Sequence, residues 1–341
     1  MQSLASLTSL GLGGAATNLV HVDSAAALET VLRDLKRSLT PVYILGGGSN
    51  LVIADEGVHG TVVCVSIRGI EVHDLGEEVL VTAGAGEPWD EFVAKSVSNG
   101  WSGVECLSGI PGSVGATPIQ NVGAYGVEIA SVFESLTAYD RDEERFLEMR
   151  KADCAFGYRS SRFRQSDRFV ISSVTFRLRK DSRSVPITYK ELGSALALDA
   201  QGKAPLLNVR ETVIRLRRAK GMVLDPSDPE SKSAGSFFTN PIVDSSVAEA
   251  LRAQHPNMPT FPQDDGRTKL AAGWLIEQSG IKKGWTINGA GISSKHALAL
   301  VNRGGTTRDL LHVASLVRHK VREKFGIELH PEPILWGCAI D

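Results

Sequence analysis

Three consecutive glycines directly follow a short apolar run near the N-terminus. The run Pro41–Leu45 predicts a buried strand, and Gly46-Gly47-Gly48-Ser49-Asn50 follows it directly. Glycine permits the backbone angles and close approaches that turn several N–H groups toward one phosphate. The loop lacks the G-x-G-x-x-G spacing that opens a helix in Rossmann folds, and it lacks the lysine of a P-loop. Taken alone, it predicts either a phosphate-binding loop or a tight turn between two strands.

A second stretch of small residues favours the ligand-binding interpretation. Residues 108–116 read Ser-Gly-Ile-Pro-Gly-Ser-Val-Gly-Ala, and residues 120–126 read Gln-Asn-Val-Gly-Ala-Tyr-Gly. A packed core has little use for so many turn formers, whereas a surface on which a flat ligand lies against backbone does. Apolar residues such as Ile110 and Val122 would bury the segment, which disfavours a flexible surface loop. Two such loops suit the two ends of a dinucleotide.

Composition limits the classes of protein that this chain can belong to. Of its 341 residues, 42% are hydrophobic, and this length predicts more than one domain. The formal net charge of -2 argues against a dedicated nucleic-acid binder, which carries a basic excess. The four cysteines form no C-x-x-C pair, so free thiols in a reducing compartment are expected. The histidines His21, His59, His73 and His255 show no metal-ligand spacing, and we expect no metal site.

The N-terminal region carries no recognisable targeting signal. The first basic residue is Arg33, whereas a secretory signal begins with positive charge and continues with an apolar run. No uninterrupted apolar stretch reaches the ~20 residues that span a bilayer. We therefore expect a cytoplasmic protein that does not insert into membranes.

Hydrophobic periodicity predicts intermixed helices and strands, which is typical of the α+β or α/β class. Helices are predicted at residues 23–36, 88–98, 207–220, 247–254, 270–278 and 307–325, and strands at 41–45, 51–53, 61–72, 78–83, 133–141 and 169–179. Thr306 with Asp309 forms a capping box for the last helix, and Asn208 with Glu211 has the spacing of another. The last helix is also predicted to bury one stripe, formed by Leu310, Ala314, Val317, Val321 and Phe325. The charged segment 140–144 predicts a solvated turn.

Several motifs, in order along the chain, resemble those of the UDP-N-acetylenolpyruvoylglucosamine reductase family. They occupy residues 44–51, 109–116, 120–126, 158–163, 235–241, 272–276 and 331–332 and so span nearly the whole chain. The resemblance implies an α+β fold of three domains. Two would form a flavin-binding fold like that of vanillyl-alcohol-oxidase-type enzymes, at residues 1–65 with 326–341 and at 66–220. The third, at residues 221–325, would bind substrate.

The resemblance also implies the reaction and its cofactor. FAD would be bound non-covalently and reduced by NADPH as co-substrate. UDP-N-acetylglucosamine enolpyruvate would then enter the same site and be reduced to UDP-N-acetylmuramate, an early cytoplasmic step of bacterial peptidoglycan synthesis. We expect a monomer whose partners are these small molecules. The implied FAD contacts are Leu45, Gly46, Gly47, Gly48, Ser49, Asn50, Leu51, Ile110, Pro111, Gly112, Ser113, Gly115, Ala116, Gly123 and Ile171.

Three residues are implied as catalytic. Hydride addition to the enolpyruvyl methylene places negative charge on the neighbouring carbon and its carboxylate, which then need a cation and an acid. Several arginines could supply the cation, and the Tyr-Arg-x-Ser-x-Phe pattern selects Arg159. The Gly-Ser-Phe-Phe motif selects Ser236 as proton donor. Glu332, after Pro331, would be protonated or would orient a group that stabilises the enol.

The UDP part of the substrate needs further hydrogen-bond donors and cations. By resemblance these are Tyr125, Tyr158, Tyr189, Lys220, Asn240 and His296. Arg217 and Arg218 remain alternatives to Lys220 for the diphosphate. Two other functions stay open from the sequence: a flavin oxidase of the same fold acting on another alcohol or sugar, and a nucleotide-sensing module without catalysis.

Overall fold

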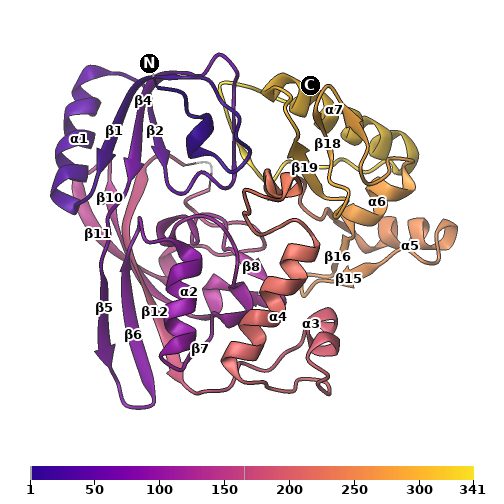
Figure 1. Cartoon of the computed structure of the whole chain (residues 1–341), viewed down its shortest axis with the longest axis horizontal. Coiled ribbons are helices and arrows are strands. Elements are labelled where there is room, and N and C mark those ends of the chain that lie inside the picture. Colours follow the sequence, from indigo (N-terminus) through magenta and orange to yellow (C-terminus); the bar gives the residue numbers. More distant parts are fainter. Residues whose placement is uncertain (1, 165) are drawn as a thin grey trace. The chain divides into compact units, whose positions relative to one another are not determined.

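The computed structural model describes residues 2–164 and 166–341, which divide into two compact units (Figure 1). Unit 1 comprises Ala16–Gly48 and His59–Arg218 together with Gln2. Unit 2 comprises Ser3–Ala15, Ser49–Val58 and Ala219–Asp341. Helices and strands are intermixed in both units, which confirms the α+β class. The division into three domains stays a prediction.

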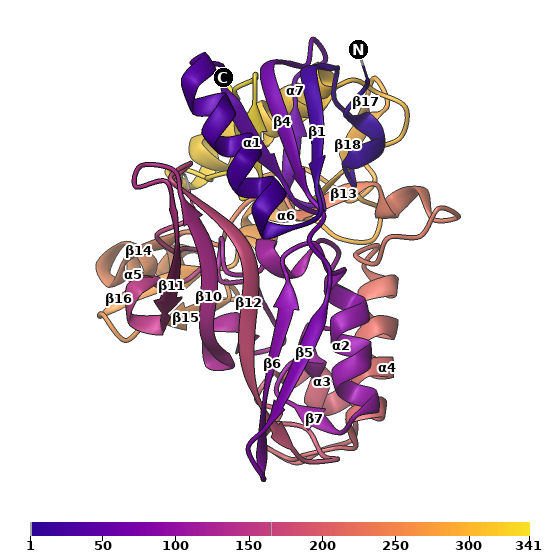
Figure 2. The same ribbon diagram turned by 90° about the vertical axis from the view of Figure 1, so that its left-hand side faces the viewer.

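Unit 1 is built on an antiparallel sheet with the strand order β11-β10-β12-β6-β5. The strands are β5 (Ile70–Asp74), β6 (Glu78–Gly84), β10 (Phe133–Asp140), β11 (Arg145–Arg150) and β12 (Phe169–Lys180), and β7 (Trp101–Ser102) also pairs with β12. Helix α2 (Trp89–Ser98) buries Trp89 and Phe92 against Phe176 of β12, at ring-centroid distances of 5.8 and 4.9 Å. Figure 2 shows α2 and α4 (Leu206–Ala219) on the same side of this sheet.

A smaller sheet in unit 1 carries the first glycine loop. Its order is β1-β4-β2, formed by β1 (Ala16–Val22), β4 (Val58–Val65) and β2 (Val42–Leu45), with α1 (Ala25–Ser38) between β1 and β2 in sequence. Strand β2 runs parallel to β4, and its register pairs Leu45 with Cys64. Because β2 ends at Leu45, Gly46 is the first residue beyond its end. The strand expected over 61–72 is in fact divided between β4 and β5.

Unit 2 contains a four-stranded sheet with the order β13-β19-β18-β17 and a three-stranded sheet with the order β14-β16-β15. The strands of the first are β13 (Ser233–Ser236), β17 (Thr286–Ile287), β18 (Ala290–Ile292) and β19 (Ala299–Asn302), and those of the second are β14 (Ile242–Asp244), β15 (Thr260–Pro262) and β16 (Arg267–Leu270). A separate parallel pair joins β3 (Leu51–Ile53) to β20 (Ile334–Trp336).

Three helices complete unit 2: α5 (Ser245–Gln254), α6 (Ala272–Gln278) and α7 (Thr307–Phe325). The capping box predicted for α7 is confirmed, because Thr306 Oγ1 accepts from Asp309 N at 3.1 Å while the Asp309 carboxylate accepts from Thr306 N. Its predicted stripe, including Leu310, Val317 and Val321, is buried in the unit 2 core. Both signals are local, which explains why they could be read from the sequence.

Three local predictions were incomplete or wrong. Helix α4 begins at Leu206, after Pro205, so Asn208 and Glu211 lie inside it and form no capping pair. The carbonyl of Pro205 accepts the first hydrogen bond of the helix, from Val209 N at 3.1 Å. Helix α3 (Lys190–Ala195), which begins just after Tyr189, was not predicted. Neither was strand β11, which forms a hairpin with β10.

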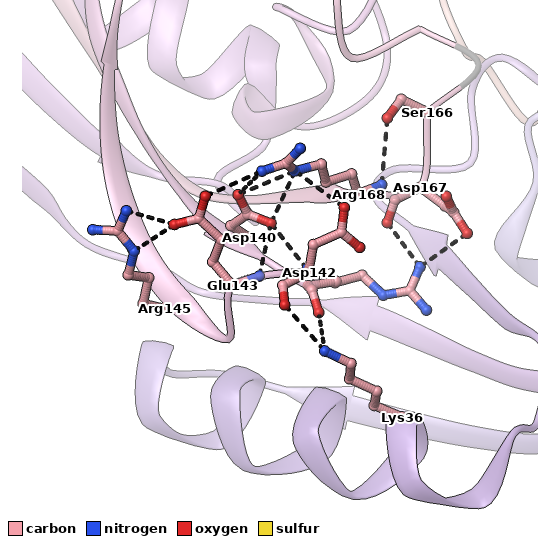
Figure 3. Close-up of polar contacts among 9 residues, drawn as sticks. Lys36, Asp140, Asp142, Glu143, Arg145, Ser166, Asp167 and Arg168 are labelled. Atoms are coloured by element: carbon pink, nitrogen blue, oxygen red, sulfur yellow. Dashed lines mark hydrogen bonds and ion pairs between the residues drawn. The ribbon is translucent and has the colours of Figure 1, made fainter.

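The charged segment 140–144 is a turn, but its first residue is not solvated. Asp140 is fully buried, and its carboxylate accepts three hydrogen bonds of 2.7–3.1 Å from Arg168 (Figure 3). The amides of Asp142 and Glu143 also donate to Oδ1, at 2.9 and 3.3 Å. The hydrogen bonds from Arg168 outweigh the opposing effect of desolvation and, with the two amides, lower the pKa of Asp140 to about 2. This residue therefore anchors the β10–β11 hairpin to the segment before β12.

Replacing Asp140 with asparagine is expected to lower the free energy of unfolding by about 1–2 kcal/mol at pH 7. The value lies between those of exposed and buried ion pairs because Arg168 remains partly exposed. A folded-state pKa below the ordinary value of 3.8 stabilises the protein above that pH, and this stabilisation is lost as pH falls toward 2. In urea unfolding of FAD-saturated protein, the difference in the free energy of unfolding between wild type and Asp140→Asn should therefore shrink between about pH 5 and pH 2. Asp167→Asn is the control, since Asp167 is exposed; an equal deficit there would contradict the prediction.

Candidate active site

The two glycine-rich loops lie against each other within unit 1. A Cβ atom added to Gly47 would stand 2.5 Å from Gly112 Cα and 2.9 Å from Ser113 N. A Cβ added to Gly46 would stand 2.8 Å from Ser113 Oγ. Real Cβ atoms do not approach backbone so closely, so the contact requires glycine. The sequence predicted two loops at two ends of one ligand; the structure places their backbones side by side.

Helix α2 and the turn before it hold the second loop in place. Trp89 N donates to Gly112 O at 3.0 Å, and Gly115 N donates to Ala85 O at 2.9 Å. Asp90, in the first turn of α2, accepts from Gly109 N at 2.5 Å. Arg210 of α4 holds the Asp90 carboxylate with two hydrogen bonds of 2.6 and 2.8 Å. The loop is therefore held in one shape by the surrounding elements, as a preorganised binding surface requires.

Arg159 occupies a strained turn beside the second loop. Its φ is +49°, a left-handed conformation that is uncommon outside glycine and that clusters at functional sites. Its Nη2 donates to Gly123 O at 2.9 Å, and its guanidinium lies 5.7 Å from the centre of the Tyr158 ring. Asn121, at φ +46° and almost fully buried, donates to Gly157 O at 3.1 Å and so ties the two segments together. Sequence reasoning assigned no role to Asn121.

Two of the predicted substrate tyrosines meet in unit 1. The rings of Tyr125 and Tyr189 are 5.5 Å apart and perpendicular. Desolvation raises the pKa of Tyr125 to about 12, against the opposing charge of Arg217. Desolvation also lowers the pKa of Arg217 to about 10; Tyr125 and Asp90 oppose this, while the like charge of Arg159 adds to it. Tyr125, Tyr189, Arg159 and Arg217 thus form an aromatic and cationic cluster suited to an anionic ligand.

Ser236 and Glu332 are brought together in unit 2. Ser236 ends β13, and the next residue, Phe237, accepts a hydrogen bond from Glu332 N at 2.8 Å. The bridge between Phe238 and Pro331 extends this pairing. Glu332 is 9% exposed and belongs to the buried charged residues. Two motifs almost 100 positions apart in the sequence therefore lie on adjacent backbone segments.

The end of the first glycine loop reaches the same place in unit 2. Asn50 Nδ2 donates to Glu332 O at 3.3 Å, and Ile334 N donates to Asn50 O at 3.0 Å. Ser9 Oγ lies 2.6 Å from Ser233 O and 3.3 Å from Ser49 O, so it links the loop to β13. Nothing in the sequence distinguishes Ser9, because it belongs to no motif and its partners are distant along the chain.

The remaining predicted residues are placed as follows. Asn240 Oδ1 accepts from Ala272 N at 2.9 Å, so this side chain holds the start of α6. His296 Nδ1 accepts from Leu298 N at 3.2 Å. Ile171 is buried in β12 of unit 1. Lys220 belongs to unit 2, whereas Arg217 and Arg218 belong to unit 1. Arg159 likewise belongs to unit 1, and Ser236 and Glu332 belong to unit 2.

This geometry fits a dinucleotide cofactor. The apposed backbones of Gly47 and Gly112 leave no room for side chains, so a ligand there meets N–H groups and carbonyls rather than bulky groups. Gly48, Gly109 and Gly112 all have positive φ, which orients successive amides differently from those of a regular strand. Residues 16–146 match the family model described as "FAD binding domain". The fold and the two loops therefore define a flavin-binding protein.

The comparisons with known proteins extend over the whole chain. Residues 226–336 match the model of the C-terminal domain of UDP-N-acetylenolpyruvoylglucosamine reductase. Reductases of that name from Thermobifida fusca and Salinispora arenicola are 48% and 47% identical to this chain, covering 99% of it and 97% and 95% of their own length. The crystal structure of the corresponding enzyme from Thermus caldophilus matches with a TM-score of 0.67 and 26% identity, over 98% of this chain and 97% of that one.

The chain belongs to the UDP-N-acetylenolpyruvoylglucosamine reductase family. The family resemblance inferred from the glycine loops and the downstream motifs is thereby confirmed, as is an α+β fold that includes a flavin-binding domain. Among the described residues, no helix combines the length and the apolar character that crossing a bilayer requires.

Proposed function

We propose that this protein reduces UDP-N-acetylglucosamine enolpyruvate to UDP-N-acetylmuramate, using FAD and NADPH, in the cytoplasmic synthesis of peptidoglycan precursors. Within a chain of this family, the observation that carries the proposal is the pairing of the Ser236 and Glu332 segments through Phe237 O and Glu332 N. It brings together a serine hydroxyl and a buried glutamate from separate motifs. The cation for the substrate carboxylate would come from Arg159.

Each residue has a defined task in this proposal. FAD, when bound in the glycine loops, supplies the hydride that NADPH provides. Arg159 holds the enolpyruvyl carboxylate, where negative charge develops as the methylene carbon accepts hydride. The Ser236 hydroxyl gives its proton to the adjacent carbon, and solvent returns a proton to the serine oxygen. Glu332 orients the group or water that hydrogen-bonds the enolate oxygen.

An anaerobic two-step assay tests the proposed function. NADPH alone should bleach the yellow purified protein, and UDP-N-acetylglucosamine enolpyruvate added afterwards should restore the colour and yield UDP-N-acetylmuramate. UDP-N-acetylglucosamine is the matched control, because it carries the nucleotide but no reducible double bond. Colour that returns with oxygen but not with the enolpyruvyl nucleotide would instead support an oxidase of the same fold.

We propose Arg217 as the arginine that contacts an anionic group of the nucleotide. Its environment supports this, because Arg217 and Arg159 are half-buried cations that repel each other beside Tyr125, and a bound anion would offset that repulsion. Replacing Arg217 with methionine should weaken nucleotide binding by about 10- to 100-fold, the effect of losing a charged hydrogen bond. Arg218→Met, at the exposed neighbouring position, should bind normally. Titrating the flavin spectrum gives both dissociation constants, and equal weakening would contradict the assignment.

A further inference from the structure

The carboxylate of Glu230 collects hydrogen bonds from two other segments of unit 2. Glu230 lies in the short 3-10 helix Pro229–Ser231 and is 8% exposed. Its Oε1 accepts from Arg303 Nε and Nη2 at 2.9 and 2.7 Å. Its Oε2 accepts from Ser293 Oγ at 2.7 Å and from Ser294 N at 2.6 Å. The Glu230 carboxylate thus accepts four hydrogen bonds and connects its own segment to Arg303 and to the segment that begins at Ser293.

The surrounding groups hold this carboxylate in its charged form. Burial alone would raise the pKa of Glu230, but the hydrogen bonds from Ser293 and Arg303 outweigh it and keep the pKa below its ordinary value. The guanidinium of Arg303 is fixed in turn, because it also donates to Ile292 O at 3.2 Å and to Thr286 Oγ1 at 2.9 Å. A second ion pair, Lys295 with Asp228 at 2.7 Å, joins the same two segments.

The segment that Glu230 holds ends beside Ser236. It spans residues 293–298 and begins at the Ser293 hydroxyl and the Ser294 amide. At its other end, Leu298 O accepts from Phe237 N at 2.7 Å, and Ser236 pairs with Ala299 in the β13–β19 register. Strand β13 itself begins at Ser233, three residues after Glu230. Glu230 therefore lies just before β13 and Ser236 at its end, and residues 293–298 contact the chain at both places.

Glu230, strand β13 and residues 293–298 form a closed ring of contacts, which we call the frame. From this frame we propose that Glu230 is a positioning residue, which sets the place of the Ser236 hydroxyl and of the His296 ring. The inference rests on the proposed function, because the position of Ser236 matters for catalysis only if it donates the proton. Glu230 itself touches neither substrate nor cofactor in this proposal. It acts through Arg303 and through the segment 293–298.

The chemistry of the network requires a carboxylate at this position. All four groups that face Glu230 are donors, and a carboxylate offers only acceptor sites to them. A glutamine of the same shape would keep one acceptor oxygen and would direct an NH₂ group toward one of the two sets of donors. Glu230→Gln therefore breaks the frame without creating a cavity.

Two measurements on Glu230→Gln test the inference. Hydrogen exchange of the purified protein should accelerate by about tenfold or more at the amides of residues 233–237 and 293–299, and not in α5. In the anaerobic assay, reoxidation by UDP-N-acetylglucosamine enolpyruvate should slow by about 10²-fold, the effect expected when a reacting group is misplaced by about 1 Å. Reduction by NADPH should be unchanged, because that step takes no proton from Ser236.

Leu251→Ala is the matched control for lost stability. Leu251 lies in the unit 2 core on α5, whose main strand contacts are with β14 and β16. This variant should be destabilised while reoxidation keeps its normal rate. Ser293→Ala removes one donor and leaves the carboxylate paired with Arg303, so it should slow reoxidation in the same direction but less. If Glu230→Gln does not fold, Ser293→Ala decides the question.

The outcomes separate the inference from the function on which it rests. A wild-type protein that the enolpyruvyl nucleotide fails to reoxidise would overturn both. Normal wild-type reoxidation, together with a Glu230→Gln or Ser293→Ala rate equal to it, would overturn the positioning role alone. The positioning role would also be overturned if Leu251→Ala slowed reoxidation as much as Glu230→Gln, because lost stability would then explain the effect.

Discussion

Replacing Ser236 with alanine is expected to slow reoxidation by UDP-N-acetylglucosamine enolpyruvate by about 10²- to 10⁴-fold, the usual contribution of a positioned acid. Reduction by NADPH should proceed normally. Ser236 ends β13 with its neighbour Phe237 tied to Leu298 on one side and to Glu332 on the other, so loss of one oxygen atom should not disturb the backbone. Stopped-flow measurement of the two half-reactions separates the two effects directly.

The control for this prediction is another serine of unit 2. Ser315 on α7 donates from its Oγ to Asp341 O and has no part in the proposed site. Ser315→Ala should behave as wild type in both half-reactions. If Ser236→Ala were reoxidised at the normal rate, the proton would have to come from another donor, and Glu332 would be the nearest candidate along the paired segments. If both half-reactions slowed equally, the serine would be serving binding rather than proton transfer.

The parts of the fold that sequence reasoning placed correctly depend on neighbours in the sequence. The capping box and the buried stripe of α7 need only residues within a few turns of one another, and both are observed. The Asn208–Glu211 pair has the right spacing, yet α4 begins at Leu206 and both residues lie inside it. Spacing alone therefore identifies candidate caps without showing which residue begins the helix.

The parts that were missed depend on partners far away along the chain. Asp140 appeared to be a solvated turn residue because its partner, Arg168, is 28 positions downstream. The links made by Ser9, Asn121 and Glu230 have the same character, since each joins segments that only the folded chain brings together. The motifs indicated which residues carry the chemistry. They did not indicate which residues hold those motifs in place, because such residues match no pattern of their own.

The contact between the two glycine loops leads to the second large effect, which is expected for Gly47→Ala. The added methyl group would stand 2.5 Å from Gly112 Cα and 2.7 Å from its carbonyl carbon, and neither backbone atom can turn away as a side chain does. Trp89 N and Asp90 hold the second loop in place, so the first loop must move instead. Overpacking of this kind costs about 1–3 kcal/mol. If that whole cost falls on the cofactor-binding conformation, FAD affinity drops by about 5- to 150-fold.

Gly193→Ala is the matched control, because it makes the same change of residue and differs only in the space around the added methyl group. Gly193 lies in α3 of the same unit, and its added Cβ would have only one neighbour, 4.0 Å away on Ile187. Alanine is favoured there by helix propensity, so this variant should keep its FAD and its stability. Flavin released on denaturation and the FAD dissociation constant measure the difference. A Gly47→Ala protein that retains stoichiometric, tightly bound FAD would show that the three glycines form a turn between strands and that the cofactor is held elsewhere.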